Sequence, residues 1–472
     1  MNEKKQNIMK TKILILACAI CTLKFNFSVA QVMDAGSNHS IAICPDSTIQ
    51  TWGRNSGGQL GNGNTNVQLI PVHSNLLSRI IAVSGGEEHS LFLRNDSTPW
   101  SCGWNQYGQL GDGTIIDRYN RVRITSLTGI IAISAGYQHS LFLKDDGTVW
   151  ACGNNQFGQL GDGSTTSRST PVQILSLSGI VAISGGFNHS LFLKNDSTVW
   201  ACGWNYYGQL GDSTTTDRLT PVKTSSLTNV MAVAAGGGHS LFLKNDSTVW
   251  SCGANSSGAL GDGSTADKHS PVLINTLTEI RAVAAGDEHS LFLRSDSSAW
   301  ACGLNANGEI GDGTTNQRNT PVQTSVVSGV TSIQCGYSHS LFLESNNTLW
   351  ACGRNDNGQL GDGTVSNRST PTQLIGLCST HDPVADIRPK IALQIFPNPT
   401  SGIVTLNFFS NYPADYNISL FDVTGRKLHH RKYAASAGMN SLEQDLGRYT
   451  KGIYILQLES GFGSEQLKIS LE

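Results

Sequence analysis

Histidine is the most regularly placed residue with chemical capacity in this sequence. A His-Ser pair recurs at intervals of 50 residues, at His39, His89, His139, His189, His239, His289 and His339. Imidazole can ligate a metal ion or transfer protons near neutral pH. One histidine at the same position of every interval, however, favours a repeated structural contact over a single reactive centre. We therefore assign no catalytic residue, no metal and no cofactor to this pattern.

Cysteine follows tryptophan two residues later in six of the seven intervals, at Cys102, Cys152, Cys202, Cys252, Cys302 and Cys352. Residues two apart on a strand share one face, so each thiol is expected beside an indole. Nine cysteines follow residue 30, which is an odd number. Equivalent positions of neighbouring repeats also seldom reach the Cα separation of about 5.5 Å that a disulfide needs. We interpret the six as small buried apolar residues.

Acidic and basic residues also recur in step. Gly-Asp turns contain Asp112, Asp162, Asp212, Asp262, Asp312 and Asp362, and a basic residue follows each one six positions later, at Arg118, Arg168, Arg218, Lys268, Arg318 and Arg368. The alternating oxygen ligands of a calcium loop are absent. Hydrogen bonding within the turn, with pairing to the basic residue, is the simpler interpretation. An anion-binding rim of six cations is the alternative.

The elements that must position these residues are short strands. In the unit around residue 190, "GIVAISGG", "HSLFLKND", "STVWACG" and "TPVQIL" are apolar or β-branched runs separated by Gly, Asn and Asp turn signals. "HSLFLK" is apolar on both alternating faces, as expected for a strand that is covered on both sides. Blades of a propeller, each packed between two neighbours, meet that condition.

The register at the two ends of the repeat predicts a closed ring. Seven units run from about residue 28 to Leu377, and the last stops just before another "GIVAISGG" would begin. The segment "VMDAGSNHS" near the start supplies that missing part. An open solenoid would instead need atypical caps. We predict an all-β chain in which residues 31–378 form a seven-bladed β-propeller of 50-residue repeats.

The first 30 residues have the layout of a secretory signal peptide, with a basic start, a short apolar run and a small-x-small site ending at Ala30. A buried helix is the alternative. No transmembrane span is expected in the mature chain. The net charge of −3 gives no support to nucleic-acid binding, which normally requires a basic domain.

The repeat resembles the regulator of chromosome condensation family in "GxxHSLFL", in "DGTVWACG" around Gly147, in "NxxGQLGDG" and in the following "TPV". The resemblance implies a seven-bladed propeller. It also raises nucleotide exchange on a small GTPase or chromatin binding, but export and the lack of a basic tail argue against both. Secreted propellers of this kind can bind proteins, so the resemblance implies an interaction protein. This sequence departs from the family by placing cysteine where tryptophan is usual.

The period ends after Cys378. Residues 379–391 are predicted to be a linker, and residues 392–472 a small β-sandwich. The latter resembles the type IX secretion C-terminal sorting domain, through Pro397, Asn398, Pro399, Gly402, Asp422, Gly425, Arg426, Gly452 and Tyr454. The resemblance implies passage through the periplasm to a secreted or outer-surface location by this secretion machinery, with the domain removed on arrival. An ordinary β-sandwich with a binding role is the alternative.

Function is expected where the repeats differ, namely in the three residues before each histidine and the four after each "CG". Units two to four place aromatic residues there, whereas units five and six have small or polar ones. We predict a protein or carbohydrate binding site at Trp104, Tyr107, Tyr137, Phe157, Phe187, Trp204, Tyr206 and Tyr207. The alternative is that these rings only cover the ends of the blades.

We therefore expect a secreted or cell-surface binding propeller that is not an enzyme. A secreted glycan hydrolase is the alternative, using the carboxylates Glu87, Glu88, Asp287 and Glu288, which depart from the repeat. A glycosidase pair needs carboxylates about 5 to 9.5 Å apart, which opposite blades offer only across a narrow channel. Guanine nucleotide exchange is a less favoured third possibility.

Overall fold

The computed structural model describes residues 33–73, 78–325, 328–378, 394–410, 414–436, 438–460 and 463–472. These residues form two compact units, divided after Cys378. The predicted signal peptide (1–30) and linker (379–391) lie outside the described residues.

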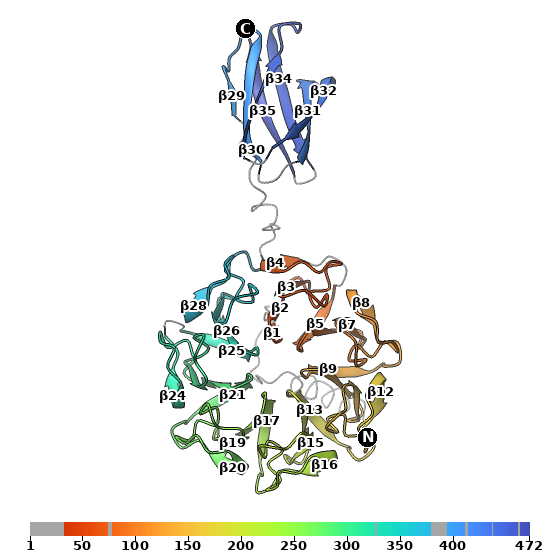
Figure 1. Cartoon of the computed structure of the whole chain (residues 1–472), viewed down its shortest axis with the longest axis vertical. Coiled ribbons are helices and arrows are strands. Elements are labelled where there is room, and N and C mark those ends of the chain that lie inside the picture. The colour runs from red at the N-terminus through yellow and green to blue at the C-terminus, as the bar shows by residue number, and fades with distance from the viewer. Residues whose placement is uncertain are drawn as a thin grey trace, which may run out of the picture. The chain divides into compact units, whose positions relative to one another are not determined.

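The first unit is a ring of seven four-stranded antiparallel sheets, which confirms the predicted seven-bladed propeller (Figure 1). Blade one comprises β1 (Met33–Ala35), β2 (His39–Ile43), β3 (Ile49–Gly53) and β4 (Gln68–His73), and blade two comprises β5 (Ile80–Gly85), β6 (His89–Arg94), β7 (Pro99–Gly103) and β8 (Arg118–Arg123). Blade three comprises β9 (Ile130–Ala135), β10 (His139–Lys144), β11 (Val149–Gly153) and β12 (Arg168–Gln173), and blade four comprises β13 (Ile180–Gly185), β14 (His189–Lys194), β15 (Val199–Gly203) and β16 (Arg218–Lys223).

Blades five to seven repeat this order. Blade five comprises β17 (Val230–Ala235), β18 (His239–Lys244), β19 (Val249–Gly253) and β20 (Lys268–Leu273). Blade six comprises β21 (Ile280–Ala285), β22 (His289–Arg294), β23 (Ala299–Gly303) and β24 (Arg318–Gln323), and blade seven comprises β25 (Val330–Cys335), β26 (His339–Glu344), β27 (Leu349–Gly353) and β28 (Arg368–Gln373). The first strand of each blade lines a central channel, and the fourth lies at the rim (Figure 1).

The second strand of each blade is buried on both faces, as its sequence predicts. In β10, Leu141 and Leu143 pack in one cluster with Phe192 and Cys202 of blade four, while Phe142 packs in another with residues of blade two. The same exchange recurs between successive blades. The core of the propeller is therefore a series of interfaces between blades, and no blade buries its apolar faces alone.

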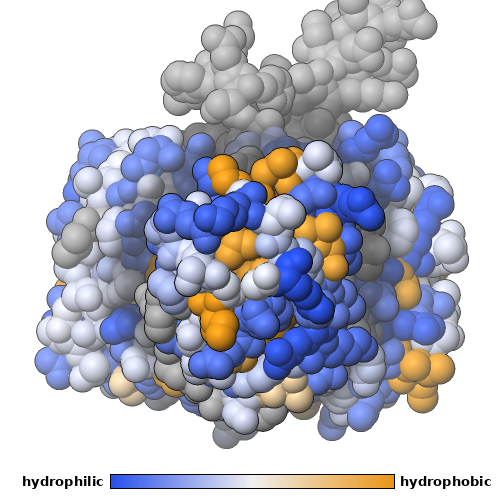
Figure 2. Space-filling model, turned by 90° about the horizontal axis from the view of Figure 1, so that it is seen from above, coloured by the Kyte–Doolittle hydropathy of each residue, from blue (hydrophilic) through white to orange (hydrophobic). Residues whose placement is uncertain are grey.

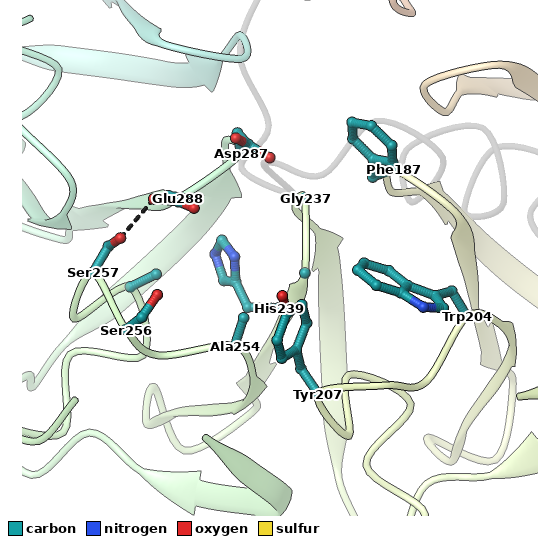
Figure 3. A pocket seen from close by; sticks show the side chains of 12 residues that line it. Phe187, Trp204, Tyr207, Gly237, His239, Ala254, Ser256, Ser257, Asp287 and Glu288 are labelled. Atoms are coloured by element: carbon teal, nitrogen blue, oxygen red, sulfur yellow. Dashed lines mark hydrogen bonds between the residues drawn. The ribbon is translucent and has the colours of Figure 1, made fainter. Parts of the chain in front are cut away.

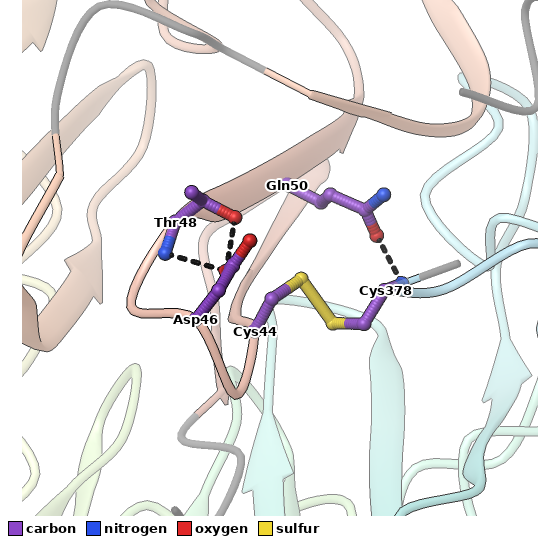
Figure 4. Close-up of a disulfide and its surroundings, with 5 residues drawn as sticks. All are labelled: Cys44, Asp46, Thr48, Gln50 and Cys378. Atoms are coloured by element: carbon purple, nitrogen blue, oxygen red, sulfur yellow. Dashed lines mark hydrogen bonds between the residues drawn. A yellow bond between two sulfur atoms is a disulfide. The ribbon is translucent and has the colours of Figure 1, made fainter. Parts of the chain in front are cut away.

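The ring closes where blade one meets blade seven, without a sheet shared between the two ends. β1 to β4 form one sheet and β25 to β28 another, and β1 lies beside β25. A disulfide between Cys44 and Cys378 joins the two ends across 334 residues of sequence (Figure 4). In addition, the backbone N–H of Cys378 donates a hydrogen bond to Oε1 of Gln50 in β3, at 2.8 Å. The repeat pattern did not predict this pairing.

The six cysteines that follow tryptophan are free thiols with no exposed surface, which confirms that they pack as small apolar residues. Each sulfur also lies close to a backbone carbonyl of the preceding blade, as Cys102 does at 3.4 Å from the oxygen of Gln59. Blade one has Trp52 in this position, and its indole N–H donates to the carbonyl of Gln359 at 2.9 Å. Tryptophan and cysteine thus fill equivalent slots and contact equivalent carbonyls.

We expect these six thiols to resist alkylation in the folded protein. Burial raises the pKa of Cys102 to about 12 and raises the pKa of the other five thiols as well, so the reactive thiolate is scarce at pH 8. Mass spectrometry after iodoacetamide treatment should find them labelled only when denaturant is present. Rapid labelling of all six without denaturant would contradict their burial.

The second unit is a β-sandwich. One sheet has the order β29 (Gln394–Phe396), β30 (Ile403–Ser410) and β33 (Gly438–Asp445); the other has the order β32 (Lys427–Ala435), β31 (Ala414–Asp422), β34 (Gly452–Ser460) and β35 (Gly463–Leu471). Its core includes Leu406, Phe408, Ile418 and Leu456. In the view of Figure 2, hydrophobic residues form small groups separated by hydrophilic ones.

None of the described residues of either unit forms a helix that is long and apolar enough to cross a membrane.

Candidate functional site

Two loops of every blade meet at the same end of the ring. Because the strands are antiparallel, the loop from the first strand to the second and the loop from the third to the fourth lie at one end of the sheet. A backbone hydrogen bond joins the two loops, as from the N–H of Trp104 to the carbonyl of Glu88 at 2.8 Å. We call this end of the propeller the loop face. All eight aromatic residues predicted to bind a partner lie in its loops.

The seven histidines form a belt between blades, which confirms their structural role. Nε2 of each lies 2.9 to 3.0 Å from the serine hydroxyl of the next blade, and His339 closes the belt on Ser40. Each serine donates its one hydrogen to a backbone carbonyl, as Ser90 does to Gln59, so Nε2–H must be the donor to the serine. Burial lowers the pKa of six of these histidines to about 3 and that of His239 to about 4.

The recurring acidic and basic residues of the turns pair with each other, as predicted. Arg118 contacts Asp112 at 2.7 Å, and the equivalent pairs recur in the following blades, with Lys268 at 3.4 Å from Asp262. Burial alone would raise the pKa of Asp112, but hydrogen bonds from Thr114 and Arg118 outweigh it and lower the pKa. These cations therefore neutralise turn carboxylates, which weakens the alternative of an anion-binding rim.

The predicted aromatic residues fall into three groups. Trp104 and Tyr107 form an edge-to-face pair in blade two, with centroids 5.5 Å apart. The rings of Tyr137 and Phe187 stack with centroids 3.7 Å apart beside the central channel. The third group gathers in the loops of blades three and four: Phe157, Trp204, Tyr206 and Tyr207, with centroids 5.0 to 6.4 Å apart. By their ring contacts the eight residues thus form three groups, and Phe187 of the second group lines one cavity together with Trp204 and Tyr207 of the third.

A cavity of about 210 Å³ opens beside the third group (Figure 3). We call it the blade-five pocket. Blade four supplies one wall with Phe187, Trp204 and Tyr207, and blade six supplies the opposite wall with Asp287 and Glu288. Blade five lies between them and contributes Gly237, Gly238, His239, Ala254, Ser256, Ser257 and Ala259.

Small residues open this pocket. A Cβ at Gly238 would lie 3.1 Å from Cβ of Ala254 and 3.2 Å from the ring of Tyr207, and a Cβ at Gly237 would collide with Asp287. At the position of Ala254, blades two and four have Trp104 and Trp204. In blade five, small residues thus leave a space on the loop face between an aromatic wall and an acidic wall.

Both carboxylates of the pocket are held in place. The Ser257 hydroxyl donates to Oε2 of Glu288 at 2.6 Å (Figure 3). Asp287 lies beside the Tyr337 hydroxyl, whose hydrogen bond lowers the pKa of this carboxyl. Burial is the larger effect and, with the charge of Glu288, raises the pKa of Asp287 to about 6. At pH 7 the carboxyl group of Asp287 is therefore mainly ionised.

The equivalent carboxylates of blade two are occupied within the chain. Glu88 forms an ion pair with Arg54 of blade one at 2.8 Å, and Glu87 accepts a hydrogen bond from the Gln138 amide at 2.7 Å. Position 254 corresponds to Arg54 but is alanine, so Glu288 has no equivalent arginine beside it. The structure therefore separates two pairs that the sequence analysis had grouped as candidate hydrolase carboxylates.

The sequence predicted the aromatic wall but not the pocket. The small residues of unit five were not among the predicted binding residues, whereas Gly237, Gly238 and Ala254 are what make room for the pocket. The available signal was the run Gly236 to Gly238, since no other repeat has three glycines before its histidine.

In the second unit, the residues that resemble the sorting motif close turns and join strands. The amide of Asn398 bonds to the backbone of Lys468 and Ser470 in β35, at 2.8 and 2.9 Å. Asp422 accepts from the N–H groups of Thr424 and Arg426, and the Tyr454 hydroxyl donates to the carbonyl of Thr450. Gly425 has a φ of 84°, which favours glycine in that turn. Pro397, Pro399 and Gly402 lie in the segment between β29 and β30, and Gly452 begins β34.

Comparisons with known proteins agree with this architecture. The regulator of chromosome condensation (RCC1) repeat matches residues 48–93, 99–143, 146–193, 196–243, 246–293, 296–343 and 346–388. The secretion system C-terminal sorting domain matches residues 394–472. A search of curated proteins found no match.

Solved structures show the same fold at low sequence identity. Human WBSCR16 is 22% identical with a TM-score of 0.63, over 69% of this chain and 93% of that one. Prp20p from Saccharomyces cerevisiae, described with its binding to Gsp1p and histones, is 24% identical with a TM-score of 0.63, over 74% and 88% of the two chains. Yeast RCC1 (Prp20) bound by Kap60 is 22% identical with a TM-score of 0.64, over 81% and 93%. The repeats, the blades and these matches together establish that this chain belongs to the RCC1 repeat family and ends in a secretion system C-terminal sorting domain.

Proposed function

We propose that this protein is an exported binding propeller that engages a protein or glycan partner through its loop face, at the blade-five pocket. The observation that carries the proposal is the cavity between the aromatic wall of Trp204 and Tyr207 and the acidic wall of Asp287 and Glu288. Half-buried aromatic rings at the edge of a cavity are typical of residues that dominate binding energy. The belt of buried histidines beneath the loops supplies a rigid frame for them.

Export follows from the sorting domain together with the predicted signal peptide. We propose passage through the periplasm, transport by the type IX system and a secreted or outer-surface location, with the sorting domain removed on arrival. The repeat alone does not carry this proposal, since it also occurs in the yeast proteins described above.

Partner capture tests the binding site. Trp204→Ala should weaken capture of a partner from culture or host material at least tenfold, because loss of a central aromatic residue removes about 2 kcal/mol or more of binding energy. Ala254→Trp, which introduces the residue that blade four has at this position, should block the pocket and have the same effect. Retention should be measured on immobilised full-length protein, with bound partners identified by mass spectrometry.

Leu304→Ala is the matched control, because Leu304 occupies the same repeat position in blade six and does not line the pocket. It should leave capture unchanged, and all three variants should keep the thermal unfolding midpoint of the parent. Undiminished capture by both Trp204→Ala and Ala254→Trp would exclude the pocket as the binding site.

One observation favours glycan hydrolysis as a second candidate. The pKa of Asp287 is raised to about 6, as suits a general acid near neutral pH. Turnover of an oligosaccharide panel by the purified protein, abolished in Asp287→Asn, would support it. Capture of a glycan without turnover would leave the binding function.

A further inference from the structure

The blade-five pocket combines aromatic rings with uncompensated negative charge. Two carboxylates line it, Asp287 and Glu288, and none of its described lining residues is lysine or arginine. His239 also borders the pocket, but burial lowers its pKa to about 4, so it is neutral at pH 7. The pocket therefore has a net negative charge at neutral pH.

The opposite wall also favours a cation. Phe187, Trp204 and Tyr207 line the side of the pocket that faces Asp287 and Glu288 (Figure 3). The faces of aromatic rings attract ammonium and guanidinium groups, tryptophan most strongly. A group between the two walls would thus meet carboxylates on one side and aromatic rings on the other.

The chain itself shows which ligand such a carboxylate takes. Between blades one and two, Nη2 of Arg54 lies 2.8 Å from Oε1 of Glu88. Glu288 occupies the repeat position of Glu88, and Ala254 occupies that of Arg54. Blade five thus has no guanidinium at the repeat position that supplies one to Glu88, and both Ala254 and Glu288 line the cavity.

We propose that the blade-five pocket binds a cationic side chain of a protein partner, arginine or lysine, in the place where an arginine equivalent to Arg54 would lie. This inference rests on the proposed function of the loop face and names the chemistry that it recognises. The cavity of about 210 Å³ is smaller than the roughly 300 to 1,000 Å³ of typical small-molecule sites. It therefore suits one side chain presented by a partner.

Short peptides test the proposal on the full-length protein. Calorimetric titration should compare the acetylated amides of Gly-Arg-Gly and Gly-Lys-Gly with those of Gly-citrulline-Gly and Gly-norleucine-Gly, which lack the charge. The cationic peptides should bind on the order of tenfold more tightly than their neutral counterparts, because charge-assisted hydrogen bonds are about twice as strong as neutral ones.

Three variants test whether the cationic peptides bind in the blade-five pocket. Ala254→Arg should supply the missing guanidinium from within the chain and prevent binding of the cationic peptides. The double variant Asp287→Asn with Glu288→Gln should bind the cationic peptides no more tightly than the neutral ones. Glu88→Gln is the matched control, because this carboxylate is already paired with Arg54, and it should bind the peptides as the parent does.

Equal binding of arginine and citrulline peptides would overturn the proposal, as would unchanged binding by Ala254→Arg. Binding of glucosamine oligomers without binding of the peptides would overturn it in favour of a glycan ligand. If partner capture depends on Trp204 but the cationic peptides do not bind, the proposed binding function stands and the proposal of a cationic ligand is wrong. If Trp204→Ala also captures its partner normally, both proposals are wrong.

Discussion

Acidification from pH 7.5 to 5.5 is expected to unfold the propeller. The seven belt histidines have a pKa of about 3 or 4 in the folded protein and about 6.5 when unfolded. Their lowered pKa means that the stability they confer is complete above pH 6.5 and is lost as the pH falls below it, because only the unfolded chain takes up the protons.

The expected size of this effect is large. Each histidine contributes about 1.4 kcal/mol per pH unit below 6.5, so the seven together lower the free energy of unfolding by roughly 10 kcal/mol between pH 7.5 and 5.5. Typical domains are stable by only about 5 to 15 kcal/mol. Burial raises the pKa of Asp34 and of Asp287 to about 6. These two carboxyls therefore stabilise the folded protein as the pH falls, but they take up at most two protons, whereas the seven histidines take up seven on unfolding.

Urea unfolding at a series of pH values, followed by tryptophan fluorescence, measures this directly. All nine tryptophans lie between Trp52 and Trp350, so the signal reports on the propeller and not on the sorting domain. In the variant His139→Asn the slope of stability against pH should fall by about one proton in seven, because one titrating group is removed. Stability that is constant between pH 7.5 and 5.5 would contradict the histidine belt.

Removing the Cys44–Cys378 disulfide should destabilise the propeller by about 2 to 5 kcal/mol, near the upper end because the bond closes a very long loop. The reason is that the cross-link restricts the unfolded chain, while in the folded ring it connects elements that already pack together. The double variant Cys44→Ala with Cys378→Ala should therefore fold but unfold at lower urea concentration. Hydrogen exchange should rise first in β1 to β4 and β25 to β28, where the ring closes.

Cys335→Ala is the control for this experiment, since Cys335 is a free thiol in blade seven and leaves the disulfide intact. Its unfolding midpoint should be sensitive to a reducing agent, as that of the parent is, whereas the double variant should not respond. Equal stability of the oxidised and reduced parent protein would show that the disulfide does not hold the ring closed.

The repeat architecture was predictable because its signals are local. The interval of 50 residues defines one blade, and the apolar residues on both faces of "HSLFLK" indicate a strand that is covered on both sides. The interpretation of Cys202 as a packing residue followed from its position two residues after Trp200. Each of these inferences needs only one repeat and its immediate copies.

The candidate site was predictable only in part. Trp204 and Tyr207 departed visibly from the repeat, and so did Asp287 and Glu288, but the sequence analysis assigned the two pairs to different hypotheses. Their meeting across blade five depends on the packing of three successive blades.

By itself, the sequence determined that this chain repeats seven times and closes into a ring, because the interval of 50 residues and the register of its two ends can be read along the chain. The sorting domain was recognisable through its resemblance to a known family. Only the tertiary structure decided which loops face each other, that Gly237, Gly238 and Ala254 leave a cavity between them, and that Cys44 pairs with Cys378. The cavity exists because small residues stand where other blades have large side chains. The disulfide that closes the ring joins the first repeat to the end of the last one. The three glycines before His239 mark a departure from the repeat, but which side chains surround them depends on how the blades pack.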